Sequence, residues 1–447
     1  MATSVSLRRL RLLFATYGFS LGFVLPWNVP QLTTSGLDPG EIGAVLGIAA
    51  LASLIAYPVW GLIADTLLGR DRTLVLTSVL AAVAGVGILL SADQPWLLAT
   101  FMVIALVCIA PWAPVTDALA LSELGNQARA YGRMRSGTSA GWVAAVIASG
   151  LIYATWGPQP VRALFVVTAL GLAVVVGGRR SARSPMRRPE RAAGERLTPA
   201  AFRSALRASP IFLPFLAVLF VSSVATNAAY AFISLRILDE GGGPLVIALA
   251  SAMPALVEIP VFRWIGPLAE RFGLRALFAV GCLISAVQMV VVAIAPVPMI
   301  IALVRLLDGA GFALRYSSIV LIAGAALPDR LRATGQSVAS LITGGIAPIV
   351  SGPAAGWIYG AFGGTALFAL CAGLLLVASG MAWLVLAPLA AARRAFAVAA
   401  SAVAASTASA ASAVAASTVA APAVGLAEGS AASSPPAAAA APGATEP

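Results

Sequence analysis

The sequence predicts an all-α integral membrane protein whose twelve transmembrane helices form two pseudo-symmetric six-helix bundles. Three observations support this prediction. The 447 residues are 60% hydrophobic and 10% charged, with a mean hydropathy of +0.95, a balance that soluble domains cannot bury. Twelve apolar runs are each long enough to cross a hydrocarbon core of about 30 Å as a helix. Two short motifs also recur about 205 residues later in the chain.

The apolar runs divide into six and six around a polar segment at 179–209. Those of the first half lie near 10–32, 41–64, 73–91, 96–122, 134–156 and 161–178. Those of the second half lie near 210–234, 245–265, 275–295, 298–326, 334–360 and 364–388. We therefore expect one bundle over 1–178 and the other over 210–390.

Two motifs of the first half return in the second. The segment from Gly61 to Asp65 (GLIAD) returns at 266–270 as GPLAE, and the segment from Gly150 to Tyr153 (GLIY) returns at 356–359 as GWIY. Two copies of one apolar unit indicate two bundles that face each other across a seam. Such a seam is where a solute could bind.

The arginines predict the orientation of the helices. All 28 basic residues are arginine, and short loops rich in arginine stay on the cytoplasmic side. They gather before the first run and in alternate loops, at 8–11, 70–72, 129–135, 179–207, 271–275, 330–332 and 393–394, whereas the loops at 33–40, 92–95, 239–244 and 361–364 have none. We expect a multi-pass protein of the cytoplasmic membrane with both termini inside. The net charge of +11 then reflects topology and anionic lipid rather than nucleic acid.

The remaining features exclude several kinds of site. Cys108, Cys282 and Cys371 fall within apolar runs, where we expect small buried side chains rather than disulfides. No histidine is present, which argues against the usual transition-metal sites and catalytic triads, and no cofactor is expected. The Pro- and Arg-rich linker at 179–209 contains a candidate interfacial helix at 198–207. The Ala/Ser/Pro-rich segment 391–447 is expected to be a disordered cytoplasmic tail.

The first repeated motif extends into an arginine-bearing turn between the second and third apolar runs. Its glycines would let two helices turn and approach closely, and its acid could hold arginines at a helix end; the residues are Gly61, Asp65, Gly69, Arg70 and Arg72. The segment resembles the G-x-x-A-D-R-x-G-R-R signature of the major facilitator superfamily, a family of membrane transporters. That resemblance implies a cytoplasmic gating motif, although Thr66 stands where the family usually has arginine. A positive-inside loop alone would explain the charges but not the repeated glycine spacing.

A narrower resemblance covers the fourth and fifth apolar runs. The segments 113–118 (APVTDA) and 131–142 (YGRMRSGTSAGW) look like the branch of the superfamily that contains lactose permease and the phenylpropionate permeases, which are proton symporters. By that resemblance Asp117 and Arg135 would face the substrate as a charged pair, and Trp142 would supply a stacking face. The alternative is a bridge from Asp117 to Arg133 or Arg135 that only ties two helices together.

Charged residues also occur inside the tenth apolar run. Arg305, Asp308 and Arg315 lie at helical spacings in a stretch that is otherwise apolar. In the same branch, the Arg305 and Asp308 pair resembles a His and Glu pair whose acid carries the coupled proton. Asp308 is therefore our candidate for proton coupling, because the proton affinity of a buried carboxylate depends on the charges beside it. A purely structural pair of Arg305 with Asp308 is the alternative.

Other candidates lie in the eighth, first and seventh runs. Glu258 stands between two prolines, an arrangement that often borders cavities, and the branch often has an E-I-P motif there. It is a second proton-coupling candidate, with a structural pairing to Arg305 or Arg315 as the alternative. Four polar residues complete the expected substrate contacts: Tyr17, Asn28, Asn227 and Tyr230.

These expectations favour a secondary transporter that moves a small organic solute by alternating access, most simply by proton symport. The solute class expected is an aromatic carboxylate, sugar or nucleoside-like compound, bound by a monomer in a lipid bilayer. A proton-antiport exporter on the same fold is one alternative. A membrane sensor or enzyme is another, although the sequence contains no clear nucleophile and base pair, metal cluster or phosphate loop.

Overall fold

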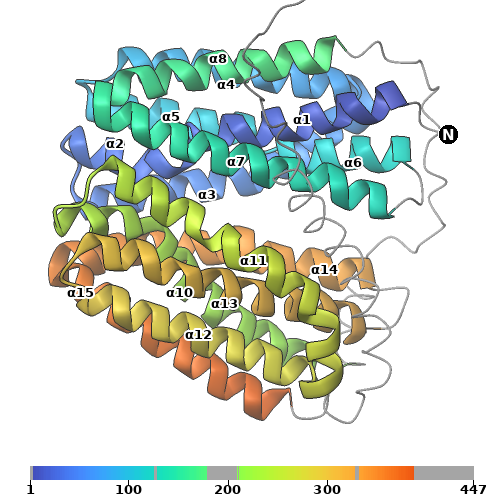
Figure 1. The fold of residues 1–447 in the computed structure, drawn as a ribbon, viewed down its shortest axis with the longest axis vertical. Helices are drawn as coiled ribbons and strands as arrows, with labels where there is room; N and C mark the ends of the chain where they lie inside the picture. Colours follow the sequence, from blue (N-terminus) through green and yellow to red (C-terminus); the bar gives the residue numbers. More distant parts are fainter. Residues whose placement is uncertain (1–3, 125–127, 179–208, 210, 328–331, 387–447) are drawn as a thin grey trace, which may run out of the picture.

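The computed structural model describes residues 4–124, 128–178, 209, 211–327 and 332–386, and every regular element within them is helical. Figure 1 shows two helical bundles side by side, one drawn in blue to green and the other in yellow-green to orange. The linker helix expected at 198–207 and the tail at 391–447 lie outside the described residues.

The first bundle contains the helices that precede the linker. They are α1 (Ser4–Gly22), η1 (Leu25–Trp27), α2 (Asn28–Thr34), α3 (Pro39–Leu62), η2 (Ile63–Leu67), α4 (Arg70–Leu90), α5 (Pro95–Ile109), α6 (Trp112–Leu124), α7 (Ala128–Trp156) and α8 (Pro158–Gly177). The fourth apolar run is thus two helices, α5 and α6, which meet at Pro111, where a proline cannot donate a backbone hydrogen bond.

The second bundle repeats this order. Its helices are α10 (Phe212–Asp239), α11 (Pro244–Phe272), α12 (Leu274–Ile294), α13 (Pro298–Ala325), α14 (Arg332–Leu341), η4 (Ile342–Ile346) and α15 (Ala347–Val385). Eleven helices of the described chain are long and apolar enough to span a membrane. The longest stretch runs from Gly335 to Val385. The backbone is not helical at Gly363, so this stretch consists of two helices that meet there. The all-helical, two-bundle prediction is confirmed, and the break accounts for a twelfth crossing.

Glycines mark the internal repeat in the backbone itself. Gly69 and Gly273 stand before α4 and α12 with φ of 80° and 81°. Gly157 and Gly363 stand between the last two crossings of each bundle, both with φ of 81°. Because side chains disfavour this left-handed region, glycine is the residue that makes these turns without strain. The repeats in sequence therefore correspond to equivalent turns.

Several helices at the arginine-poor end, where the loops near 38, 93, 240 and 296 lie, begin with strong start signals. The Asp38 carboxylate accepts a hydrogen bond from the backbone N–H of Glu41 at 2.8 Å, and Glu41 accepts one from the N–H of Asp38 at 2.9 Å. This reciprocal pair caps α3. Proline occupies the first turn of α5, α8, α11 and α13, where its missing N–H costs nothing.

The two bundles touch most closely near this arginine-poor end. Helix α3 packs along α15, and α7 packs along α11. A Cβ atom built on Gly43 would lie 2.5 Å from the carbonyl oxygen of Gly352, and one on Gly356 would lie 2.3 Å from that of Pro39. By contrast, a Cβ on Gly61, at the arginine-rich end of α3, would have nothing within 4 Å. Gly352 and Gly356 thus serve close helix packing, whereas a Cβ on Gly360 would make only ordinary contacts at 3.9 Å.

Two polar side chains of η1 and α2 are buried inside the first bundle. Trp27 is fully buried, and its indole N–H donates to the hydroxyl of Ser149 at 3.0 Å. Gln31 is also buried and accepts a hydrogen bond from Arg162 at 3.0 Å. Both residues therefore link the start of the chain to α7 and α8 of the first bundle. The three cysteines are buried and free, as predicted.

Candidate functional site

A buried cluster of charges lies between α10 and α13. Arg305, Asp308 and Arg315 of α13 are only 9%, 3% and 6% exposed. The guanidinium of Arg305 lies 2.9 Å from Asp308 Oδ2, and the Tyr230 hydroxyl of α10 donates to Asp308 Oδ1 at 2.6 Å. Arg315 approaches the same hydroxyl at 3.5 Å. The structure thus brings together four of the candidate residues: one oxygen of Asp308 forms an ion pair with Arg305, and the other accepts a hydrogen bond from Tyr230.

Arg305 is held by two further interactions. Its guanidinium carbon lies 5.0 Å from the centre of the Tyr230 ring, and its Nε donates to the carbonyl oxygen of Ala250 at 3.2 Å. Ala250 precedes Pro254 by four residues in α11, and a proline has no N–H to bond the carbonyl four residues earlier. The proline therefore leaves a backbone acceptor free inside the protein, and Arg305 takes it. This contact ties α13 to α11.

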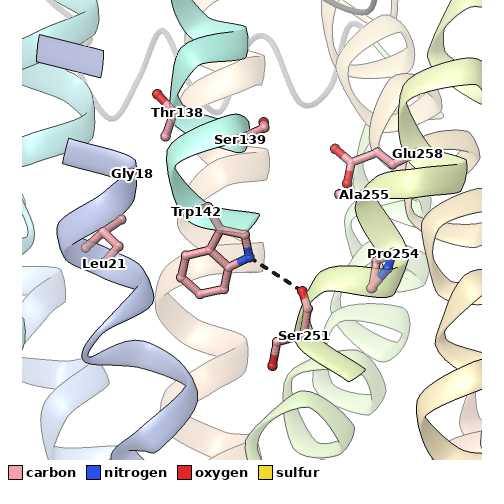
Figure 2. Close-up of a pocket in the computed structure, with 9 residues that line it drawn as sticks. All are labelled: Gly18, Leu21, Thr138, Ser139, Trp142, Ser251, Pro254, Ala255 and Glu258. Carbon is pink, nitrogen blue, oxygen red and sulfur yellow. Dashed lines mark hydrogen bonds between the residues drawn. The ribbon is translucent and has the colours of Figure 1, made fainter. Parts of the chain in front are cut away.

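An inner cavity of about 200 Å³ lies at the seam between the bundles. Figure 2 shows its walls, which come from α1, α7 and α11. The Trp142 indole N–H points to the carbonyl oxygen of Ser251, 3.5 Å away across the seam. The Glu258 carboxylate and the Ser139 hydroxyl point toward one another from α11 and α7 (Figure 2). The full lining is Gly18, Leu21, Thr138, Ser139, Trp142, Ser251, Pro254, Ala255 and Glu258.

A second, outer chamber of about 150 Å³ lies next to the inner cavity on its arginine-poor side. Ser251 lines both spaces. The other walls of the outer chamber are Leu25, Pro26, Asn28, Val29, Leu46, Tyr230, Ala231, Ile233 and Ser234. Tyr230 therefore lines the outer chamber and also donates its hydroxyl hydrogen to Asp308.

The cavity residues of α7 and α11 that were not predicted lie on the same helix faces as the predicted Glu258 and Trp142. Ser251, Ala255 and Glu258 recur at intervals of four and three, which places them on one face of α11. Thr138, Ser139 and Trp142 are similarly close on α7. The sequence could have indicated these additional cavity residues, because small polar residues share a helix face with a candidate acid. Together the lining residues offer a ligand hydrogen-bonding groups beside the aromatic ring of a tryptophan.

Other expected residues lie elsewhere. Asn227 does not line either space; its amide donates to the carbonyl oxygens of Ser223 and Thr343, at 2.8 and 3.1 Å, and so links α10 to η4. Tyr17 packs against the hydrophobic core and lines neither space. Asp117 is half-buried in α6, and the side chain of Arg135 lies outside the described residues. The expected pairing of Asp117 with Arg135 is therefore still a prediction.

The arginine-bearing turn has the geometry of a helix junction. Asp65 lies in η2, and the Arg70 guanidinium is 3.7 Å from its carboxylate. The same guanidinium donates to the carbonyl oxygen of Ala118 at 3.0 Å. Because Asp65 is largely exposed, the ion pair alone contributes little to stability. The bond to Ala118 ties the turn to α6.

Comparisons with known proteins agree with this architecture. The model of the MFS_1 like family matches residues 7–370. The maltose permease of Geobacillus stearothermophilus is 27% identical over 332 residues, which are 73% of this chain and 81% of the permease. The structure of the nucleoside transporter NupG aligns with a TM-score of 0.72 and 14% identity, over 85% of this chain and 99% of NupG. The structure of the POT family transporter PepTSo aligns with a TM-score of 0.66 and 14% identity, over 89% of this chain and 99% of PepTSo.

The two structural matches concern the fold alone, because their sequences are so different. The eleven apolar helices and the related membrane transporters together indicate that the chain is a multi-pass membrane protein.

Proposed function

We propose that this chain, a secondary transporter that belongs to the MFS_1 like family, couples the uptake of a small hydroxylated organic solute to the entry of protons. The observation that supports the proposal is the buried cluster of Tyr230, Arg305, Asp308 and Arg315 beside two adjoining spaces at the seam. Ionised side chains are costly inside a membrane protein and are retained where ions or polar solutes pass. No catalytic role is proposed.

The orientation follows from the arginines. We place the arginine-rich end and both termini in the cytoplasm, because basic loops stay on that side of the cytoplasmic membrane. The tight contacts of Gly43 and Gly356 then close the external end. The conformation is one in which solute would leave toward the cytoplasm, and rocking of the bundles would open the other end.

The lining of the inner cavity supports a solute with a ring and hydroxyl groups. Trp142 offers an aromatic face, on which the apolar face of a ring can pack. Glu258 offers carboxylate oxygens, and Ser139 and Thr138 offer hydroxyls. Among the described lining residues none is cationic, which favours hydroxyls over a carboxylate as the bound groups. A sugar or a nucleoside fits this chemistry, and the related permease is named for maltose.

Asp308 is the proposed proton carrier. As a carboxylate it is held by Arg305 and by the Tyr230 hydroxyl. A proton on one of its oxygens removes the negative charge, which weakens the ion pair and frees the guanidinium to reorient. The structure of the seam then depends on whether the proton is bound, and the proton leaves when the cavity opens to the cytoplasm. Glu258 is proposed as a second site, whose carboxylate either binds a proton or accepts a hydrogen bond from a solute hydroxyl.

Truncation of Trp142 tests the solute site. Trp142→Ala should raise the KM for solute about tenfold or more, because an aromatic contact and its buried area are both lost. Trp142→Phe, which keeps a ring, should retain most of the affinity. The measurement is counterflow of labelled maltose and of labelled uridine in proteoliposomes loaded with the same unlabelled compound.

The control for this prediction is Trp357→Ala, since Trp357 is 64% exposed and lines neither space. An unchanged KM in Trp142→Ala, or an equal rise in Trp357→Ala, would contradict the proposed solute site. Failure of the wild-type protein to exchange either compound would count against the sugar or nucleoside class.

A further inference from the structure

The outer chamber has no role in the coupling scheme above, and its walls come from both bundles. Elements η1, α2 and α3 supply Leu25, Asn28 and Leu46 from one side, and α10 and α11 supply Tyr230 and Ser251 from the other. A space shared between bundles changes shape whenever the bundles rock against each other. An occupant of this chamber would therefore be sensitive to the transport cycle.

The chamber adjoins the inner cavity at Ser251, which lines both spaces. The carbonyl oxygen of Ser251 faces the Trp142 indole N–H at 3.5 Å, and its hydroxyl is turned back to the carbonyl oxygen of Ile247 at 2.9 Å. Neither space alone, at about 200 and about 150 Å³, reaches the ~300–1,000 Å³ usual for small-molecule sites, whereas the two joined do. The volumes point to one solute that extends past Ser251.

Asn28 is the chamber residue with unused hydrogen-bonding capacity. It is 9% exposed, and its side-chain oxygen is buried without a hydrogen-bond partner in the described part of the chain. Tyr230, by contrast, already donates its hydroxyl proton to Asp308. A buried amide oxygen that lacks a hydrogen-bond partner is costly. A solute that bonds this amide relieves that cost.

We propose that the outer chamber is a second subsite of the solute site, in which the amide of Asn28 binds a hydroxyl or N–H group at the far end of the solute. The inference rests on the proposed transport function. The solute then has two parts, a ring against Trp142 in the inner cavity and a hydrogen-bonding end in the outer chamber. That end lies beside Tyr230, whose hydroxyl bonds Asp308, so the subsite connects the solute to the charge cluster.

Two pairs of probes, each a longer and a shorter compound, test the subsite: maltose with glucose, and uridine with uracil. Dissociation constants are measured with purified wild-type protein and with Asn28→Leu, which keeps the approximate size but removes the amide. We expect the wild type to prefer the longer member of at least one pair. Asn28→Leu should weaken binding of that longer member about tenfold and change that of the shorter member less than about twofold.

The matched control is Thr33→Val on the same helix, because the Thr33 hydroxyl bonds the carbonyl oxygen of Val29 and lines neither space. If Asn28→Leu does not fold, Asn28→Ala gives the same comparison without added bulk. Equal weakening of both members of the pair, or none, would overturn the subsite while leaving transport standing. A wild-type protein that binds none of the four probes would overturn the proposed solute class and the subsite with it.

Discussion

Asp308→Asn is expected to abolish solute accumulation against a gradient while leaving exchange of solute across the membrane intact. Asparagine keeps the size of the side chain and an oxygen that can still accept from Tyr230 or Arg305, but it cannot bind and release a proton. Uptake driven by a pH gradient should fall to equilibration with the outside, whereas counterflow, which needs no net proton movement, should continue. Both are measured with the same proteoliposomes and the same labelled solute.

The chain offers a close control for this prediction. Asp239 also accepts a hydrogen bond from a tyrosine hydroxyl, that of Tyr359, in the same bundle, but it lies at the arginine-poor end and is exposed. Asp239→Asn should retain accumulation. Uphill accumulation by Asp308→Asn at the wild-type level would remove Asp308 from the coupling scheme. Loss of both accumulation and exchange, with a folded protein, would make the pair with Arg305 structural.

Gly356→Ala is expected to reduce transport strongly by holding the external end open. Its Cβ would lie 2.3 Å from the carbonyl oxygen of Pro39, so α3 and α15 could not keep their present contact. Overpacking of this kind costs about 1–3 kcal/mol, which would lower the ratio of the externally closed to the externally open conformation about fivefold or more. The measurement combines transport rate with the labelling rate of a cysteine placed at Ser234 in the outer chamber, using a membrane-impermeant maleimide from outside.

Gly360, one turn further along α15, provides the comparison. A Cβ there would have its nearest neighbours at 3.9 Å, an ordinary contact, so Gly360→Ala should transport and label as the wild type does. Faster labelling in Gly356→Ala alone is the expected pattern. Slow labelling with full transport in Gly356→Ala would show that the α3 and α15 contact is not an external gate.

The fold could be predicted from the sequence because its signals are local and repeated. Long apolar runs leave few options in a membrane, since backbone groups must be satisfied within each segment. The turns at Gly69 and Gly273 recur because glycine readily takes their positive φ. What the sequence did not reveal is the interruption of apolar runs, as at Pro111 and at the π-helical turns η2 and η4, because hydropathy does not distinguish a continuous helix from a broken one.

The site was predictable only in part, for a physical reason. Charges in apolar helices stand out, so Arg305, Asp308, Arg315 and Glu258 could be selected from composition and spacing. Neutral polar residues do not stand out, because their partners depend on packing between distant segments. Asn227 was expected at the solute but bonds the backbone of Thr343, while Ser251, which lies between the two spaces, was not singled out at all.

The central claim is that the buried charge cluster couples solute movement to protons, and an imposed pH gradient tests it most directly. Purified wild-type protein is reconstituted in liposomes, and uptake of labelled maltose and uridine is followed with the outside made acidic. The account predicts that the internal concentration of at least one solute rises above the external one and that a protonophore collapses the excess. Internal solute that never exceeds the external concentration, with or without the gradient, would contradict it.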